Sequence, residues 1–196
     1  DNLIESFHDA QQAMDMTLQL FASGMLSLSH RAIAERLFWK ICQQIREHFN
    51  NLSDVPENLN ALRALFAETY IGNFSLFQSL RDHWAIRQLF PVMPIEYLNE
   101  EPELDAVLGD ITCDSDGRIG CFLNEKGPGN QPAVRVHSLK NRSQYFLGVF
   151  LTGAYQEAIG QQHNLLGTTN AVTVEWFDGV PQLSDSCAGS TIQQVL

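Results

Sequence analysis

The first third of the chain carries apolar side chains at alternating steps of three and four residues, the spacing of one helical face. The stripe approaches Gly24, and glycine readily adopts the left-handed conformation that ends many helices. Because an apolar stripe must pack against another element, this pattern constrains the fold more than any other feature of the chain. It predicts an opening helix with one face formed by Ile4, Phe7, Gln11, Met14, Leu18 and Phe21.

A second helix is predicted after Ser29, whose hydroxyl can cap its N-terminus. Cys42 lies on this helix beside the apolar face and fits a small core position. A third, shorter helix follows from the spacing of Leu59, Leu62 and Phe66. Residues 1–69 are therefore predicted to form a helical bundle. The buried face of its second helix should contain Ile33, Leu37, Ile41 and Ile45.

Beyond residue 70, short runs rich in aromatic and β-branched residues alternate with turns, which is typical of strands. The run 145–151 is apolar throughout, as in a strand buried on both faces. Val172, Val174 and Trp176 should point inward from the last strand. The predicted fold class is α+β, with a mainly antiparallel, sandwich-like or barrel-like β domain over residues 70–196. Strands are expected within 70–79, 106–113, 118–123, 145–151 and 171–177, and a helix is expected to start near 154.

Charge and cysteine content exclude several partners. The formal net charge of −11 opposes binding to nucleic acid or to an anionic membrane, which both attract a surplus of Lys and Arg. No apolar run approaches the ~20 residues that span a bilayer. The four cysteines form no Cys-x-x-Cys pair, which indicates a reduced, cytoplasmic protein instead of a disulfide framework.

The stretch "GDITCDSDGRIG" (residues 109–120) surrounds one thiol, Cys113, with the carboxylates of Asp110, Asp114 and Asp116. Nearby negative charge disfavours a thiolate, so this thiol should stay protonated and can donate a proton. The same carboxylates can attract a cation. The alternative is an Asp-rich turn with an inert, buried cysteine, and composition alone favours that alternative.

Metal binding fits these residues poorly. A calcium loop aligned on this turn would have Thr112 at its first position and Leu123 at its twelfth, where an acid and a glutamate are required. A zinc site needs short paired spacings, which are missing among Cys113, Cys121, His137 and His163. The sequence therefore predicts no metal ligands.

A second candidate is "TGAYQEAIG" (residues 152–160). Gly153 and Ala154 allow close backbone approach just before a helix N-terminus, where anions bind readily. Tyr155 can add a hydroxyl group. An ordinary strand-to-helix turn with a packed tyrosine is the alternative.

Three segments together resemble the C-terminal part of the biosynthetic arginine decarboxylases, which are pyridoxal-phosphate enzymes of the alanine-racemase-like fold. The resemblance covers most of the chain and includes "SGMLSLSHRAIAERLFWKIC" in the helical part. The segments occur in the family's order and are "NFSLFQSLRDHWAIRQLFPVMP", "DITCDSDGRI" and "YFLGVFLTGAYQEAIGQQHNLLG".

The resemblance implies a (β/α)8 barrel that carries pyridoxal phosphate, followed by a β domain, with residues 1–69 as an inserted helical bundle. It implies a homo-oligomer built on two-fold dimers, in which Cys113 and Asp114 reach the substrate L-arginine across the interface. Asp116 belongs to the same motif, and Tyr155 after Gly153-Ala154 would bind the cofactor phosphate. The implied reaction converts arginine to agmatine and CO2 for spermidine and other polyamines. Mg²⁺ is a further cofactor that the resemblance allows.

The barrel needs about 250 residues and does not fit beside the segments assigned above. Lys40, Lys126 and Lys140 are the lysines present, and none resembles the family's cofactor-binding lysine. The N-terminal barrel portion of the same protein is therefore an expected partner, and this chain alone should be inactive.

Three alternatives stay open. A sister enzyme acting on lysine, ornithine or diaminopimelate is disfavoured by the arginine-type form "CDSDG". A non-catalytic, decarboxylase-like interaction module is disfavoured by the intact Cys113, Asp114 and Tyr155. An unrelated α+β binding domain would not be expected to contain three ordered motifs.

Overall fold

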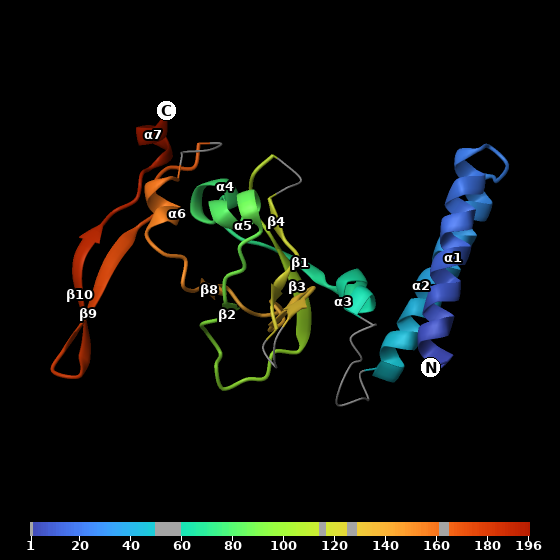
Figure 1. The fold of residues 1–196 in the computed structure, drawn as a ribbon, viewed down its shortest axis with the longest axis horizontal. Coiled ribbons are helices and arrows are strands. Elements are labelled where there is room, and N and C mark those ends of the chain that lie inside the picture. The colour runs from blue at the N-terminus through green and yellow to red at the C-terminus, as the bar shows by residue number, and fades with distance from the viewer. Residues whose placement is uncertain (1, 50–59, 114–116, 125–128, 161–164) are drawn as a thin grey trace. The chain divides into compact units, whose positions relative to one another are not determined.

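The computed structural model describes residues 2–49, 60–113, 117–124, 129–160 and 165–196. The chain divides into two compact units, Asp1–Phe66 and Ala67–Leu196. The first unit is entirely helical in its described part, and the second combines short strands with short helices (Figure 1).

The helical unit contains α1 (Asn2–Ala22), α2 (Leu28–Phe49) and α3 (Asn60–Phe66). As predicted, the first helix stops before Gly24, whose φ of 76° is left-handed. The amide of Met25 donates to the carbonyl oxygen of Leu20 at 2.9 Å, which satisfies one of the carbonyls left free at the helix end. The residue that caps α2 is Ser27 and not the predicted Ser29. Its Oγ accepts a hydrogen bond from the His30 amide, in the first turn of the helix, at 3.4 Å.

The core of this unit is smaller than the predicted stripe. It consists of Phe7, Cys42, Ile45 and Leu62, with Phe38 packed at its edge. Burial raises the pKa of the Cys42 thiol, which suits the core role predicted for it.

The prediction for the buried face of α2 is wrong at Ile33, Leu37 and Ile41, which are exposed. The predicted residues are all four apart, and at 3.6 residues per turn such steps drift by about 40° each. Ile33 therefore lies about 120° around the helix from Ile45. The true seam runs through Phe38, Cys42 and Ile45, at steps of four and three.

The second unit is organised by β3 (Leu104–Gly109), the central strand of its four-stranded sheet. β1 (Glu68–Ile71) pairs with it in parallel, while β4 (Arg118–Ile119) and β7 (Val134–Val136) pair with it antiparallel. The register places Tyr70 opposite Leu108 and Val134 opposite Ala106. Cross-strand partners share a face of a sheet, so these side chains form one apolar surface.

Short elements cover that surface. They are the helix α4 (Leu76–Ser79), which α5 (Arg81–Ile86) follows, and two antiparallel strand pairs, β2 (Val92–Pro94) with β8 (Leu147–Val149) and β5 (Phe122–Leu123) with β6 (Asn130–Gln131). Leu76, Leu80, Phe90 and Phe122 bury their side chains against the sheet residues. The structure thus confirms an α+β unit with mainly antiparallel pairing, and its described strands close no barrel.

Four predicted strands of this unit are wrong in extent. The one expected within 106–113 ends at Gly109, and the one expected within 118–123 is divided into β4 and β5. The strand expected within 70–79 ends at Ile71, and α4 follows because Ser75 accepts a hydrogen bond from the Gln78 amide at 3.3 Å. Phe74 and Leu76 alternate like strand residues, but the capping serine between them starts a helix instead. The run 145–151 forms a strand only over Leu147–Val149, which is half-buried, and Phe150 beyond it is exposed.

The C-terminal part contains α6 (Tyr155–Ala158), the hairpin of β9 (Ala171–Phe177) and β10 (Val180–Cys187), and α7 (Ile192–Val195). The strand predicted at 171–177 is confirmed, and the chain turns at Asp178-Gly179 with φ values of 49° and 79°. The predicted inward orientation of Val172, Val174 and Trp176 is wrong, because all three are exposed. Among the described helices, none is both long and apolar enough to cross a membrane.

Two isoleucines on α2 test which of its residues form the core. Ile45 is 3% exposed and Ile33 is 47% exposed. We expect Ile45→Ala to lower the free energy of unfolding of the helical unit by about 2–5 kcal/mol, and Ile33→Ala to change it by about 0.5 kcal/mol or less. Urea unfolding of the chain, followed by the circular dichroism signal of its helices, measures both changes in stability. Equal losses would show that the predicted stripe is the core after all.

Candidate functional site

The acidic turn joins β3 to β4, and a backbone hydrogen bond connects its two ends. The Asp110 amide donates to the Gly117 carbonyl oxygen at 2.8 Å. Cys113 is exposed at this turn, which contradicts the burial expected in the alternative of an inert cysteine. The predicted substrate residues Asp114 and Asp116 lie outside the described residues.

Asp110 holds the turn in place. Its Oδ1 accepts from the Thr112 amide at 3.0 Å and from the Thr112 hydroxyl at 2.6 Å, while its Oδ2 accepts from the Leu76 amide at 2.7 Å. Leu76 is the first residue of α4, so one side chain fastens the turn to that helix. A Cβ atom at Gly117 would overlap the Asp110 carboxylate, so only glycine fits there. Of the carboxylates around Cys113, Asp110 therefore has a structural role, which its spacing to Thr112 could have indicated.

The second candidate segment leads into α6. Gly153 has a φ of 73°, and no atom lies within 4 Å of the position a Cβ would take. Ala154 is exposed, and Tyr155 is 73% exposed. The neighbouring Gln156 is buried instead. The backbone and one side chain of this segment are thus open to a ligand, although α6 is only a single turn.

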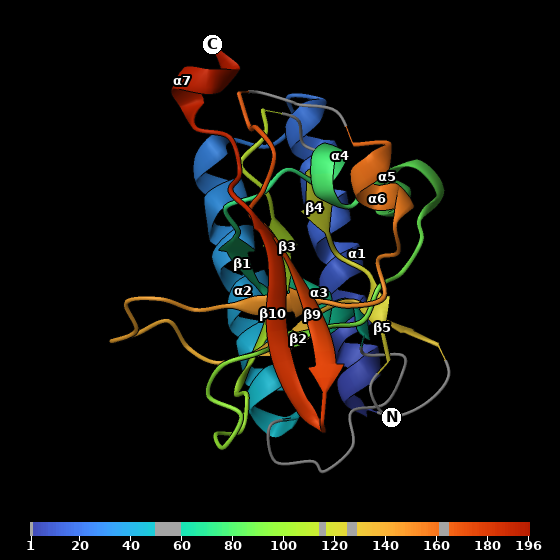
Figure 2. The same cartoon turned by 90° about the vertical axis from the view of Figure 1, so that its left-hand side faces the viewer.

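Gln156 fixes this segment to α5. Its Oε1 accepts from the Asp82 amide at 3.1 Å, and its Nε2 donates to Asp82 Oδ2 at 2.5 Å. α6 also packs against α4, and Figure 2 shows the three short helices together. Both candidate segments are therefore anchored on α4–α5, the acidic turn through Leu76 and the Gly-Ala-Tyr turn through Asp82.

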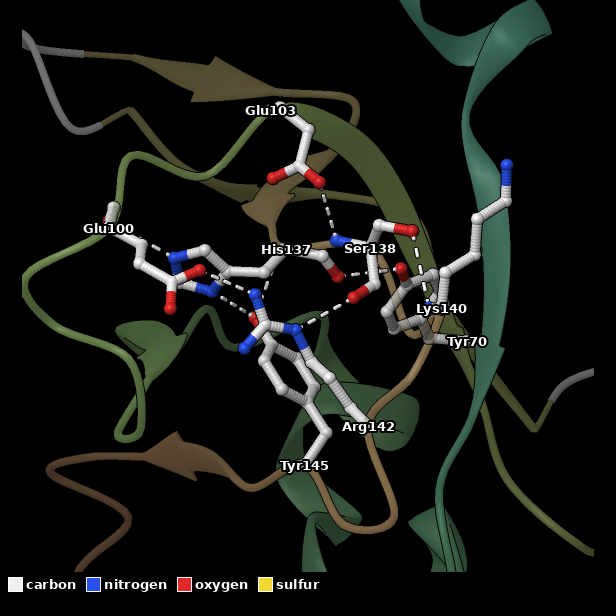
Figure 3. Close-up of polar contacts among 8 residues, drawn as sticks. All are labelled: Tyr70, Glu100, Glu103, His137, Ser138, Lys140, Arg142 and Tyr145. Carbon is white, nitrogen blue, oxygen red and sulfur yellow. Dashed lines mark hydrogen bonds and ion pairs between the residues drawn. The ribbon is translucent and has the colours of Figure 1, made fainter.

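A buried histidine network stabilises the chain that leads to β8 (Figure 3). The His137 Nε2 lies 3.1 Å from the Glu100 carbonyl oxygen and its Nδ1 lies 2.8 Å from the Tyr145 hydroxyl. Because a carbonyl oxygen only accepts, Nε2 carries the proton and Tyr145 donates to Nδ1. The Tyr145 hydroxyl also accepts from the His137 amide at 2.9 Å, and the Tyr70 hydroxyl donates to the His137 carbonyl oxygen at 2.9 Å.

Arg142 extends this network to the surface. Its guanidinium carbon lies 3.7 Å from the centre of the Tyr97 ring, and its Nη2 lies 2.6 Å from Glu100 Oε2. The Ser138 amide donates to Glu103 at 2.9 Å, which lowers the pKa of that carboxyl group. Both ring nitrogens of His137 are used within the protein, so this histidine has a structural role that its place in the sequence did not indicate. Within the described part of the chain, no cluster of three or more His, Cys, Asp or Glu could hold a metal ion.

The described surface of the second unit has at least two hollows. One of about 470 Å³ is lined by Val92, Pro102, Leu123 and Arg135, among others. One of about 420 Å³ is lined by His83, Arg87, Leu89, Gly120, Cys121 and Asn130. Neither hollow is lined by Cys113 or Tyr155.

Comparisons with known proteins agree with one another. Residues 1–63 match the family model described as the arginine decarboxylase helical bundle domain. The biosynthetic arginine decarboxylase of Rhodopirellula baltica is 47% identical over 195 residues, which cover 100% of this chain and 29% of that protein. The corresponding protein of Phocaeicola vulgatus is 45% identical over 99% of this chain and 30% of its own length. The crystal structure of the biosynthetic arginine decarboxylase of Campylobacter jejuni matches with a TM-score of 0.66 at 33% identity, over 95% of this chain and 29% of that one.

The matched bundle domain defines the class, because it places the helical unit among domains of the arginine decarboxylase type. Similarity over the whole chain then defines the family. The chain corresponds to the C-terminal region of the biosynthetic arginine decarboxylases, as the three motifs predicted. It spans 29% and 30% of the length of the two curated relatives named above.

Replacing Asp110 tests whether its carboxylate holds the acidic turn. Asp110→Ala leaves the amides of Leu76 and Thr112 without their acceptor, so we expect the second unit to lose about 1.5–3 kcal/mol of stability. Thr112→Val removes only the hydroxyl donor and should cost about 1 kcal/mol. Denaturant unfolding of the three proteins measures both losses. A stable Asp110→Ala protein would contradict the structural role.

The tyrosines of the histidine network predict a loss of stability in alkali. Burial raises the pKa of Tyr70 and of Tyr145 above 10.0, their ordinary value. The unfolded chain therefore releases these protons first, so the stabilisation is complete below about pH 10 and is lost as the pH rises through the folded-state values. Urea unfolding at a series of pH values should show this fall.

Tyr145→Phe separates the contribution of one phenol. We expect a lower stability at neutral pH, by about 1–3 kcal/mol, because the His137 amide and Nδ1 lose their partner. Its further loss in alkali should be smaller than that of the unchanged protein. Tyr155→Phe, at an exposed tyrosine, is the control and should keep the neutral-pH stability. An unchanged alkaline loss in Tyr145→Phe would contradict the assignment.

Proposed function

We propose that this chain is the C-terminal part of a pyridoxal-phosphate-dependent arginine decarboxylase, which converts L-arginine to agmatine and CO2 for polyamine and spermidine synthesis. The observation that carries the proposal is the 47% identity to a protein named biosynthetic arginine decarboxylase over 100% of this chain. The chain spans 29% of that relative, and the active site would also draw on residues from elsewhere in the complete protein.

Cys113 would be the acid of the reaction. After CO2 leaves arginine, the α-carbon must take up a proton, and a neutral thiol held beside it can supply one. The exposure of Cys113 supports this role, because the thiol is accessible to a substrate bound by another part of the protein. The anchoring of its turn through Asp110 gives the thiol a fixed starting position.

Asp114 and Asp116 would select the substrate. The guanidinium of arginine is a planar fork of donors that a carboxylate can bind through two hydrogen bonds. Two carboxylates next to Cys113 in sequence would place the cationic end of the substrate near this turn. A substrate with a shorter side chain, or with an ammonium group in place of the guanidinium, would lose part of this pairing.

Pyridoxal phosphate, when bound, supplies the electron sink for decarboxylation. Residues of this chain fit its phosphate group, because Tyr155 presents an exposed hydroxyl and Gly153 an open backbone. Ala154 between them adds no bulk, so all three could contact phosphate oxygens. The lysine that binds the cofactor would lie outside this chain, and no described cluster supports a role for Mg²⁺.

The complete enzyme would be a cytoplasmic homo-oligomer built on two-fold dimers. In each dimer this segment would complete the barrel site of the partner, and the exposure of Cys113 and Tyr155 leaves both side chains accessible for such a contact. The β strands would form part of a sandwich in the complete chain. The four cysteines form no disulfide among the described residues, which supports a reducing compartment.

CO2 release from arginine, lysine and ornithine by the complete parent protein tests this function. We expect release from arginine only, and only after pyridoxal phosphate is added. Cys113→Ala should lower kcat about 10²-fold or more with little change in KM, and Asp114→Ala should mainly raise KM. Cys187→Ala, at another exposed cysteine, is the matched control and should behave as the unchanged protein.

Three results would reject parts of the proposal. A preference for lysine or ornithine would indicate a sister decarboxylase. No release from any amino acid, in a folded protein that binds the cofactor, would indicate a non-catalytic module. An unchanged kcat in Cys113→Ala would remove the acid role while leaving the activity itself established.

A further inference from the structure

The β9–β10 hairpin has one apolar face and one polar face. In its register Trp176 lies opposite Pro181 and Val174 lies opposite Leu183, and cross-strand partners share a face. Val172 belongs to the same face, because side chains alternate along a strand. This apolar face is in solvent, with Trp176 exposed by 74% and Leu183 by 75%.

The opposite face is polar along most of its length, although Phe177 and Val180, which pair next to the turn, are exposed on it by 63% and 59%. Thr173 pairs with Ser184 and Glu175 pairs with Gln182. The Ser184 hydroxyl donates to Glu175 Oε2 at 3.2 Å, so the polar side chains of this face interact with one another. The contrast between the two faces indicates that the apolar face is a contact surface.

Nothing in the described part of the chain covers the apolar face. The two strands pair only with each other there, and each residue of β9 is exposed. A lone two-stranded hairpin is only marginally stable in water, and a contiguous exposed apolar patch usually marks an interaction surface. The hairpin therefore needs a partner.

Charge decides between two kinds of partner. The last 32 residues, 165–196, contain Glu175, Asp178 and Asp185 and neither Lys nor Arg. Two copies of this hairpin placed face to face would contribute acidic side chains, with Asp178 at the turn and Asp185 near the bulge of β10, and no Lys or Arg from residues 165–196 to balance them. A second copy is therefore a poor partner, and a surface with Lys or Arg around an apolar centre is a good one.

We propose that this face of the hairpin (Val172, Val174, Trp176, Pro181 and Leu183) docks on an apolar, Lys- or Arg-rimmed surface of the parent polypeptide outside this chain. The partner's identity rests on the proposed function, which makes this chain part of a larger decarboxylase. The available length supports it, because this chain covers only 29% of the Rhodopirellula baltica relative and most of such a protein could contribute the surface.

Fluorescence of Trp176 in the complete parent protein tests the proposal without using activity. Trp39→Phe and Trp84→Phe, together with replacement of any tryptophan elsewhere in the parent, leave Trp176 as the only indole. We expect acrylamide to quench it several-fold less than free N-acetyltryptophanamide. Quenching as efficient as that of the free indole would overturn the proposal, since the face would then be open in the complete protein.

Two aspartate substitutions on adjacent residues of β9 give a matched pair. Val174→Asp puts a charge on the apolar face, and Thr173→Asp puts the same charge on the polar face. We expect only Val174→Asp to lower the urea midpoint of the complete protein, or to prevent folding, and to raise the quenching of Trp176 where the protein folds. Equal effects of the two substitutions would overturn the proposal.

Dilution distinguishes the partner. Protection of Trp176 that is independent of protein concentration supports a surface of the same polypeptide. Protection that is lost on dilution would show a second copy as partner and overturn the proposal. Because neither measurement uses CO2 release, a protein that docks the hairpin but fails to decarboxylate arginine would reject only the proposed function.

Discussion

The candidate site depends on the carboxylate of Asp110, which accepts three hydrogen bonds at the end of β3. A carboxylate that accepts from backbone amides forms stronger hydrogen bonds than a neutral acceptor, so a single side chain can fix a turn. Through Leu76 it joins the Cys113 turn to α4, and through the packing of α4 against α6 the Tyr155 turn is linked to the same helices. The two segments of the proposed site are thus supported by one small helical framework.

The buried His137 network has the same function at the other end of the sheet. Every polar group of the histidine has a partner in the chain, and the two tyrosines that serve it come from β1 and from the residues before β8. Fully paired buried groups favour one arrangement, because a slipped strand would leave several of them unsatisfied. The His137 network therefore fixes the position at which β8 begins. It also fixes the start of the segment that leads from β8 to Gly153.

Sequence patterns predicted local structure well and its environment poorly. The end of α1 at Gly24 and the extent of β9 follow from residues close in the chain, and both are confirmed. The predicted inward orientation of Trp176 is wrong, because its side chain is exposed. Alternation shows which face of a strand is apolar, but it does not show whether another element covers that face. At α2 the spacing of isoleucines suggested a seam that drifts around the helix, while the shorter path through Cys42 forms the core. The role of Asp110 depends on the Leu76 amide, 34 positions away in sequence, and no local pattern includes that partner.

The hydrogen bond from Tyr70 to His137 has a consequence for the order of folding. It joins residues 67 positions apart, and the central strand is completed only when β1, β4 and β7 have all been added to it. Closing such long loops costs chain entropy before the contacts repay it, whereas α1 and α2 are neighbours along the chain and need only a short turn. During synthesis the helical unit can therefore form early. The sheet can be completed only after the chain has been made to residue 137 and beyond. β3, the strand that leads to Cys113, is therefore completed only after most of this chain exists.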